Sequence, residues 1–67
     1  MKYIKLEYIN GLTELINLDN IKKIQIQNNL ISFIFKNYEI TNYPKEGPFA
    51  INNFEEIKEL LFKISEN

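Results

Sequence analysis

The distribution of apolar residues along the chain predicts several short strands followed by one helix. Residues 30–35 form an apolar run that is too short for a helix and rich in residues that favour strands. The segments on either side alternate apolar with polar residues, and the polar pairs Asn28-Asn29 and Lys36-Asn37 separate them from the central run. This succession is typical of a three-stranded antiparallel meander with residues 30–35 as its central strand.

Two-residue loops at both polar pairs would fix the register of the two hairpins and sort the side chains onto two faces. The first loop places Ile24 opposite Phe33, and the second places Phe33 opposite Ile40. One face is then apolar and is expected to form the core, with members Ile24, Ile26, Ile31, Phe33, Phe35, Tyr38 and Ile40. The other face is mixed and mostly uncharged, with members Gln25, Gln27, Leu30, Ser32, Ile34, Glu39, Thr41 and Tyr43.

A further hairpin is predicted before the meander. Residues 3–8 alternate apolar with polar side chains and are followed by an Asn-Gly pair. A three-residue loop with Gly11 at positive φ would bring Ile4 beside Ile16. A two-residue loop would set Glu7 against Glu14, a like-charge pair that sheets avoid. The three-residue loop is therefore favoured.

The segments after these two hairpins predict a short turn, a loop and a helix. Asp19 is expected to cap a single helical or 3₁₀ turn, and Pro44–Pro48 contains two prolines and a glycine that forbid regular structure. Asn53, with a glutamate three residues later, predicts a capping-box start for a helix over about 54–65. One face of that helix is apolar, with members Phe54, Ile57, Leu60, Leu61 and Ile64, whereas Phe62 falls on the other side.

These elements predict the α+β class. Residues 1–67 are expected to form one domain, a small antiparallel meander sheet of about five strands packed against one C-terminal helix. A chain of 67 residues buries a small share of its surface, and it has no cysteine or histidine for a disulfide or a typical zinc site. We therefore expect no metal or cofactor, and we expect a homodimer or another protein partner to supply the missing burial.

Composition also narrows the class of function. Eight lysines against nine acidic residues give a net charge of −1, and arginine is absent, so neither a basic nucleic-acid surface nor an acidic DNA mimic is indicated. Without histidine, cysteine or arginine, the groups available for catalysis are few, and we expect no enzymatic activity. No apolar run is long enough for a membrane span, and charged residues interrupt the N-terminus where a signal peptide would be apolar. A cytoplasmic protein is expected.

The mixed face of the predicted sheet is the candidate interaction surface. It combines apolar and aromatic side chains with neutral hydrogen-bonding groups, a composition that is typical of protein interfaces. Phe62 is a second exposed candidate on the helix. The protein-interaction residues predicted in this way are Leu30, Ile34, Tyr43, Gln25, Ser32, Thr41 and Phe62.

The order of features is similar to that of the FlbD-like family of short flagellar and swarming-motility proteins. The similar parts are a strand ending in Ile9–Gly11, an apolar and asparagine-containing segment at Ile16–Ile21, and an acidic helix start at Phe54–Ile57. The chain departs from that family at Gln27–Asn29, where the family has a Pro-Asp-Thr turn, and in the added loop Pro44–Asn52. The resemblance implies a non-catalytic role through partner binding.

We therefore expect a small module that binds a larger protein, as a regulator, an adaptor or a phage-type inhibitor such as an anti-CRISPR protein. One alternative is a motility-associated protein, which the resemblance implies. The other is a weak binder of single-stranded nucleic acid, in which Tyr3, Tyr38 and Tyr43 would stack on bases beside nearby lysines. The balanced charge makes that last alternative the least favoured.

Overall fold

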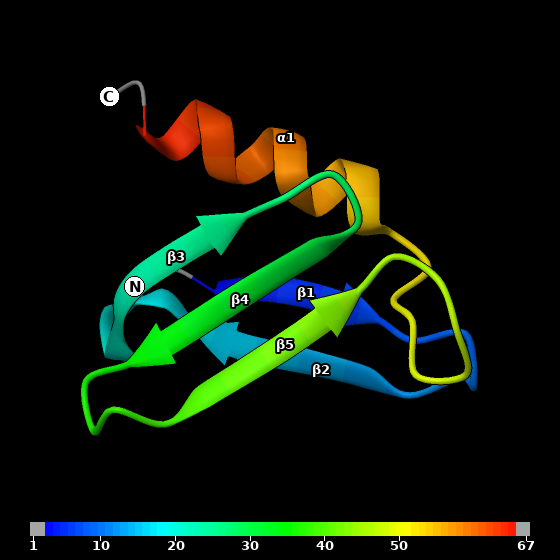
Figure 1. The fold of residues 1–67 in the computed structure, drawn as a ribbon, viewed down its shortest axis with the longest axis horizontal. Coiled ribbons are helices and arrows are strands. Elements are labelled where there is room, and N and C mark those ends of the chain that lie inside the picture. The colour runs from blue at the N-terminus through cyan, green and yellow to red at the C-terminus, as the bar shows by residue number, and fades with distance from the viewer. Residues whose placement is uncertain (1–2, 66–67) are drawn as a thin grey trace.

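A computed structural model describes residues 3–65 (Figure 1). Strands β1 (Tyr3–Glu7) and β2 (Thr13–Asn17) form one antiparallel sheet, and strands β3 (Ile21–Ile26), β4 (Leu30–Phe35) and β5 (Ile40–Pro44) form a second. A 3₁₀ turn (Leu18–Asn20) joins the sheets, and helix α1 (Phe54–Ser65) ends the described chain. The predicted α+β class, with five antiparallel strands and a C-terminal helix, is confirmed. The terminal residues 1–2 and 66–67 of the predicted domain lie outside the described residues.

The two sheets face each other, and α1 lies along the side between them (Figure 1). The core therefore draws on both sheets, the helix and the segment before the helix. Its buried members are Ile4, Leu6, Ile31, Phe33, Tyr43, Ile51, Phe54, Ile57 and Leu61. Sequence periodicity predicted the strands, but it did not predict that they divide into two sheets, because periodicity carries no information on which sheet each strand joins.

The first hairpin and the β3–β4 hairpin have the predicted registers. In the first, Gly11 has a φ of 94° and Ile4 lies opposite Ile16. In the second, a two-residue loop leaves Ile24 opposite Phe33. The side chains of β3 and β4 therefore lie on the faces that the sequence indicated.

The predicted register of the β4–β5 hairpin is wrong by one residue. The loop has three residues, because the Phe35 N–H donates to the Glu39 carbonyl at 2.9 Å and Tyr38 adopts a φ of 70°. Phe33 consequently lies opposite Thr41, not Ile40. Since side chains alternate along a strand, this single residue moves every side chain of β5 to the other face.

The two three-residue loops share one geometry. The Asn10 side chain accepts from the Leu12 N–H, and the Asn37 side chain accepts from the Glu39 N–H, each at 3.0 Å. A residue with positive φ follows each asparagine, and it is a glycine in the first loop but Tyr38 in the second. Tyrosine seldom adopts this conformation, and the sequence therefore did not signal the longer loop. Tyr38 was expected in the core, but it is 72% exposed.

Helix α1 begins and ends where the sequence predicted, but Asn53 has a different role. Its Oδ1 accepts from the Glu7 N–H at 3.1 Å, and its Nδ2 donates to the Lys5 carbonyl at 2.9 Å. The side chain therefore ties the start of the helix to β1, and the capping-box prediction is wrong in this respect. Asn17 caps the 3₁₀ turn, since its Oδ1 accepts from the Asp19 N–H at 2.9 Å.

Candidate protein-interaction surface

The three-stranded sheet has one face that no described helix or strand covers (Figure 1). We call it the outer sheet face. The inner face supplies Ile31, Phe33 and Tyr43 to the core, so alternation along the strands assigns the intervening residues to the outer sheet face. Its members are Lys23, Gln25, Leu30, Ser32, Ile34, Ile40, Asn42 and Pro44.

Between β4 and β5, the residues of the outer sheet face form three cross-strand pairs. Leu30 lies opposite Pro44, and Ile34 lies opposite Ile40. Between these apolar pairs Ser32 lies opposite Asn42, and its Oγ donates to the Asn42 Oδ1 at 2.6 Å. Two apolar pairs thus flank a neutral hydrogen-bonded pair.

Exposure differs among the apolar members of this face. Ile40 is 62% exposed because β5 is an edge strand. Leu30 and Ile34 lie on the central strand and are half-buried. Lys23 is the one formal charge among the paired positions of this face, and it lies on β3 opposite Ile34. The part of the outer sheet face that β4 and β5 form is apolar and uncharged.

The structure places four of the predicted residues together on this face, namely Leu30, Ile34, Gln25 and Ser32. Two predictions are wrong, since Thr41 and Tyr43 lie on the inner face as a result of the longer loop. Tyr43 is only 3% exposed and belongs to the core. Ile40 lies on the outer sheet face in place of Tyr43. It was not among the predicted interaction residues, because the predicted two-residue loop assigned it to the core. Phe62 is exposed on α1, as predicted, and is not part of the outer sheet face.

The two buried or half-buried tyrosines of the interior remain protonated over a wide pH range. Burial raises the pKa of Tyr43 to about 12, and the negative charge of Glu14 adds to this effect. Burial also raises the pKa of Tyr8, whose hydroxyl donates to the Glu14 Oε1 at 2.7 Å. Both hydroxyls therefore stay protonated near neutral pH.

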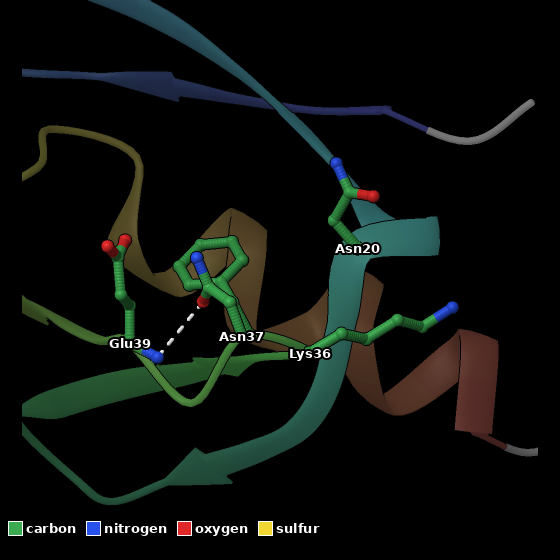
Figure 2. Close-up of a pocket in the computed structure, with 5 residues that line it drawn as sticks. Asn20, Lys36, Asn37 and Glu39 are labelled. Carbon is green, nitrogen blue, oxygen red and sulfur yellow. Dashed lines mark hydrogen bonds between the residues drawn. The ribbon is translucent and has the colours of Figure 1, made fainter.

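A pocket of about 310 Å³ lies between the 3₁₀ turn and the β4–β5 loop, lined by Asn20, Phe35, Lys36, Asn37 and Glu39 (Figure 2). The Lys36 N–H donates to the Asn20 carbonyl at 2.9 Å and holds the two segments together. The side chains of Lys36 and Glu39 lie on either side of Asn37 in Figure 2 and do not point toward each other. The pocket offers amide groups and an aromatic wall to a small polar ligand, but it does not pair a nucleophile with a base. Within residues 3–65, no cluster of three or more metal-binding side chains forms.

A second group of exposed apolar side chains lies at the end of the sandwich where the first hairpin loop and the loop before α1 run side by side (Figure 1). Its members are Ile9, Leu12 and Phe49, and the Ile9 N–H donates to the Ala50 carbonyl at 3.1 Å. Phe49 is exposed, whereas the next two residues, Ala50 and Ile51, are buried.

Comparisons of this chain with family models, curated proteins and solved structures find no match. In the part of the chain that the structure describes, no helix is both long enough and apolar enough to cross a membrane. The surfaces of the molecule are therefore the basis for a functional proposal.

Proposed function

We propose that this protein is a non-catalytic interaction module that acts in the cytoplasm by binding a larger protein through its outer sheet face. The observation that carries the proposal is the arrangement of Leu30–Pro44 and Ile34–Ile40 on either side of the Ser32–Asn42 hydrogen bond. Interface centres are typically depleted of charge and contain apolar anchors among neutral hydrogen-bonding groups.

The energetics of the face also favour a protein partner. Ile40 is 62% exposed, so a partner that covers it removes apolar surface from water, which is the main favourable contribution to association. The Ser32 hydroxyl already donates to the Asn42 Oδ1, so this donor and acceptor stay paired when a partner covers them. The partner we infer therefore has an uncharged apolar patch of its own.

A regulator, an adaptor or a phage-type inhibitor would each use such a surface, and so would a motility protein of the kind that the FlbD-like resemblance implies. Self-association belongs to the same proposal, because a second copy offers the same apolar residues of β4 and β5 about a two-fold axis. We propose a homodimer through the outer sheet face as the state of the free protein.

The test is a double variant, Ile34→Thr with Ile40→Thr, which keeps β-branched residues on the strands but removes their apolar ends. The matched control is Leu15→Thr, because Leu15 is also 62% exposed but belongs to the two-stranded sheet. Circular dichroism first establishes that each variant is folded. Sedimentation velocity at micromolar concentration then reports assembly, and affinity capture from the source cells, followed by binding measurements with purified candidates, reports partners.

The expected result is that wild type and Leu15→Thr form a dimer and bind the same partner, whereas the double variant does neither. A folded double variant with the assembly state and partners of wild type would contradict the proposal. In that case the exposed group Ile9, Leu12 and Phe49 becomes the surface to test.

A further inference from the structure

Strand β3 is an edge strand, and its edge away from β4 has unpaired backbone groups. The Gln27 N–H donates to the Leu30 carbonyl at 2.8 Å, and residues of an antiparallel strand alternate between bonding inward and outward. Gln25 and Gln27 therefore bond to β4, while Ile24 and Ile26 direct their N–H and carbonyl groups away from it. Among residues 3–65, nothing outside the β3–β4 ladder hydrogen-bonds the backbone of Ile24 or Ile26.

An apolar groove lies beside this edge. It has a volume of about 400 Å³ and runs between β3 and the C-terminal half of α1, with apolar lining from Leu18, Ile21, Ile24, Leu61 and Ile64. Figure 1 shows this half of α1 beside β3. A strand added to the edge would place every second side chain over the groove, because side chains alternate along a strand.

The charges that line the groove are mainly positive. Lys22 and Lys23 line it together with a single acidic residue, Asp19, whereas the chain as a whole has a net charge of −1. The Lys22 ammonium lies over the Tyr38 ring, 4.3 Å from its centroid, and Lys23 lies opposite Ile34 on the outer-face side of β3. A second copy of this chain would bring its own two lysines to the same junction, and like charges across paired strands are unfavourable. Charge complementarity therefore favours an acidic occupant from another protein.

We infer that the edge of β3 and this groove form a second binding site, which takes an extended acidic segment of a partner protein as an added strand. The backbone groups of Ile24 and Ile26 bond the segment, and its alternate apolar side chains enter the groove. Its acidic side chains point to the opposite face of the added strand and meet Lys23, which lies on that face opposite Ile34. The Lys22 ammonium, over the Tyr38 ring in the free protein, adds positive charge at the same end of β3. This site goes beyond the proposed function, since it lies on the strand edge and not on the outer sheet face.

The probe is a short, end-blocked synthetic peptide in which valine alternates with glutamate. Two comparison peptides replace each glutamate by glutamine or by lysine. Fluorescence anisotropy measures affinity, and amide hydrogen exchange followed by NMR reports protection of Ile24 and Ile26. We expect the glutamate peptide to bind best and to slow exchange at these two amides by about tenfold or more, because they exchange freely at an open edge.

The charge of the groove is tested with Lys22→Glu and Lys23→Glu together. We expect this variant to prefer the lysine peptide to the glutamate peptide. The matched control is Lys36→Glu with Lys58→Glu, which changes the net charge by the same amount away from the groove and should keep the preference for glutamate. The Ile34→Thr and Ile40→Thr variant should bind the peptide as wild type does, so failure of this inference is distinguishable from failure of the proposed function.

Four results would overturn the inference. The first is no binding of the glutamate peptide at about millimolar concentration. The second is binding without protection of Ile24 and Ile26. The third is a variant with Lys22→Glu and Lys23→Glu that still prefers the glutamate peptide. The fourth is protection of both amides in the peptide-free protein that disappears on dilution, which would assign the edge to a second copy of the chain.

Discussion

Tyr43 packs edge-on against Phe33, with the ring centroids 5.1 Å apart and the ring planes at 60°. Phe35 continues this aromatic row, with its centroid 6.4 Å from that of Phe33. The three rings lie on the inner face of the three-stranded sheet, and Phe33 is the central one. Its side chain is fully buried, and the core around it includes residues of β1 and α1.

Phe33→Ala should reduce the free energy of unfolding by about 3–5 kcal/mol, because it removes the central ring and leaves a cavity. A domain of this size has a total stability of roughly that order, so the variant should be largely unfolded at room temperature. Urea unfolding followed by circular dichroism measures the change. Ile34→Ala, next to it on the outer sheet face and half-buried, is the control and should cost distinctly less. Similar losses for the two variants would contradict the assigned faces.

The sequence contained most of the information on the elements and on two of the three hairpins. The number of residues between apolar runs determines a hairpin register, and this count gave the register of the loop at Asn28-Asn29. At the loop that contains Gly11, the like-charge pair Glu7 and Glu14 of the shorter alternative decided the length. The third loop depends on Tyr38 adopting a positive φ, and the preferences of tyrosine give no indication of this. A change of one residue in loop length then exchanged Ile40 and Tyr43 between surface and core.

The predicted members of the candidate site on β3 and β4 were assigned to the correct face, whereas those on β5 were assigned to the wrong face. Leu30, Ile34 and Ser32 lie on the expected face because the central strand fixes their alternation. The division into two sheets and the groove beside β3 had no counterpart in the pattern. Both depend on how segments distant in sequence pack together, which hydrophobic periodicity does not encode.

Positions 38 and 11 should both favour glycine over alanine, because both have a positive φ. At position 38 the comparison is Tyr38→Gly with Tyr38→Ala. Both lose the contact of the ring with the Lys22 ammonium, which lies 4.3 Å from the ring centroid, but only glycine relieves the positive φ of 70°. We expect the glycine variant to be more stable than the alanine variant by about 1 kcal/mol.

Gly11→Ala should lower the stability by about 1 kcal/mol, because an L-residue is strained at its φ of 94°. Nothing lies within 4 Å of the added methyl group, so the cost measures backbone conformation alone. Thermal and urea unfolding of the three variants give the comparison. Equal stability of Tyr38→Gly and Tyr38→Ala would show that position 38 is unstrained, and the assigned loop would then be wrong.

Asn53 offers a test of whether the residue before α1 serves the helix or the sheet. Aspartate is as good a helix N-cap as asparagine, so a capping role predicts no loss for Asn53→Asp. The structure predicts a loss of about 1–3 kcal/mol, because the carboxylate cannot donate to the Lys5 carbonyl, which lies 2.9 Å from Nδ2. Asn53→Ala loses both bonds to β1 and is the reference for their complete removal. Urea unfolding of Asn53→Asp that coincides with wild type would contradict the role assigned to this side chain.

Alkaline pH should destabilise the fold through the tyrosines of the interior. Burial raises the pKa of Tyr43 from 10.0 to about 12, so the folded protein keeps a proton that the unfolded chain has already lost. This contribution to stability is complete below about pH 10 and is lost as the pH rises to about 12. Tyr8, whose pKa is also raised by burial and by its bond to Glu14, acts in the same direction. We expect stability to fall by about 1–2 kcal/mol through this window for Tyr43 alone.

The control is Tyr43→Phe, which keeps the ring against Phe33 but has no group to titrate. Lysines lose their protons over part of the same window in wild type and variant alike, so the difference between the two curves isolates Tyr43. Urea unfolding at several pH values between about 8 and 12 measures both curves, and tyrosinate absorbance reports the ionisation directly. The variant should lose less stability than wild type as the pH rises. Parallel curves would mean that the Tyr43 hydroxyl is accessible to solvent, and the β5 register that buries it would then be wrong.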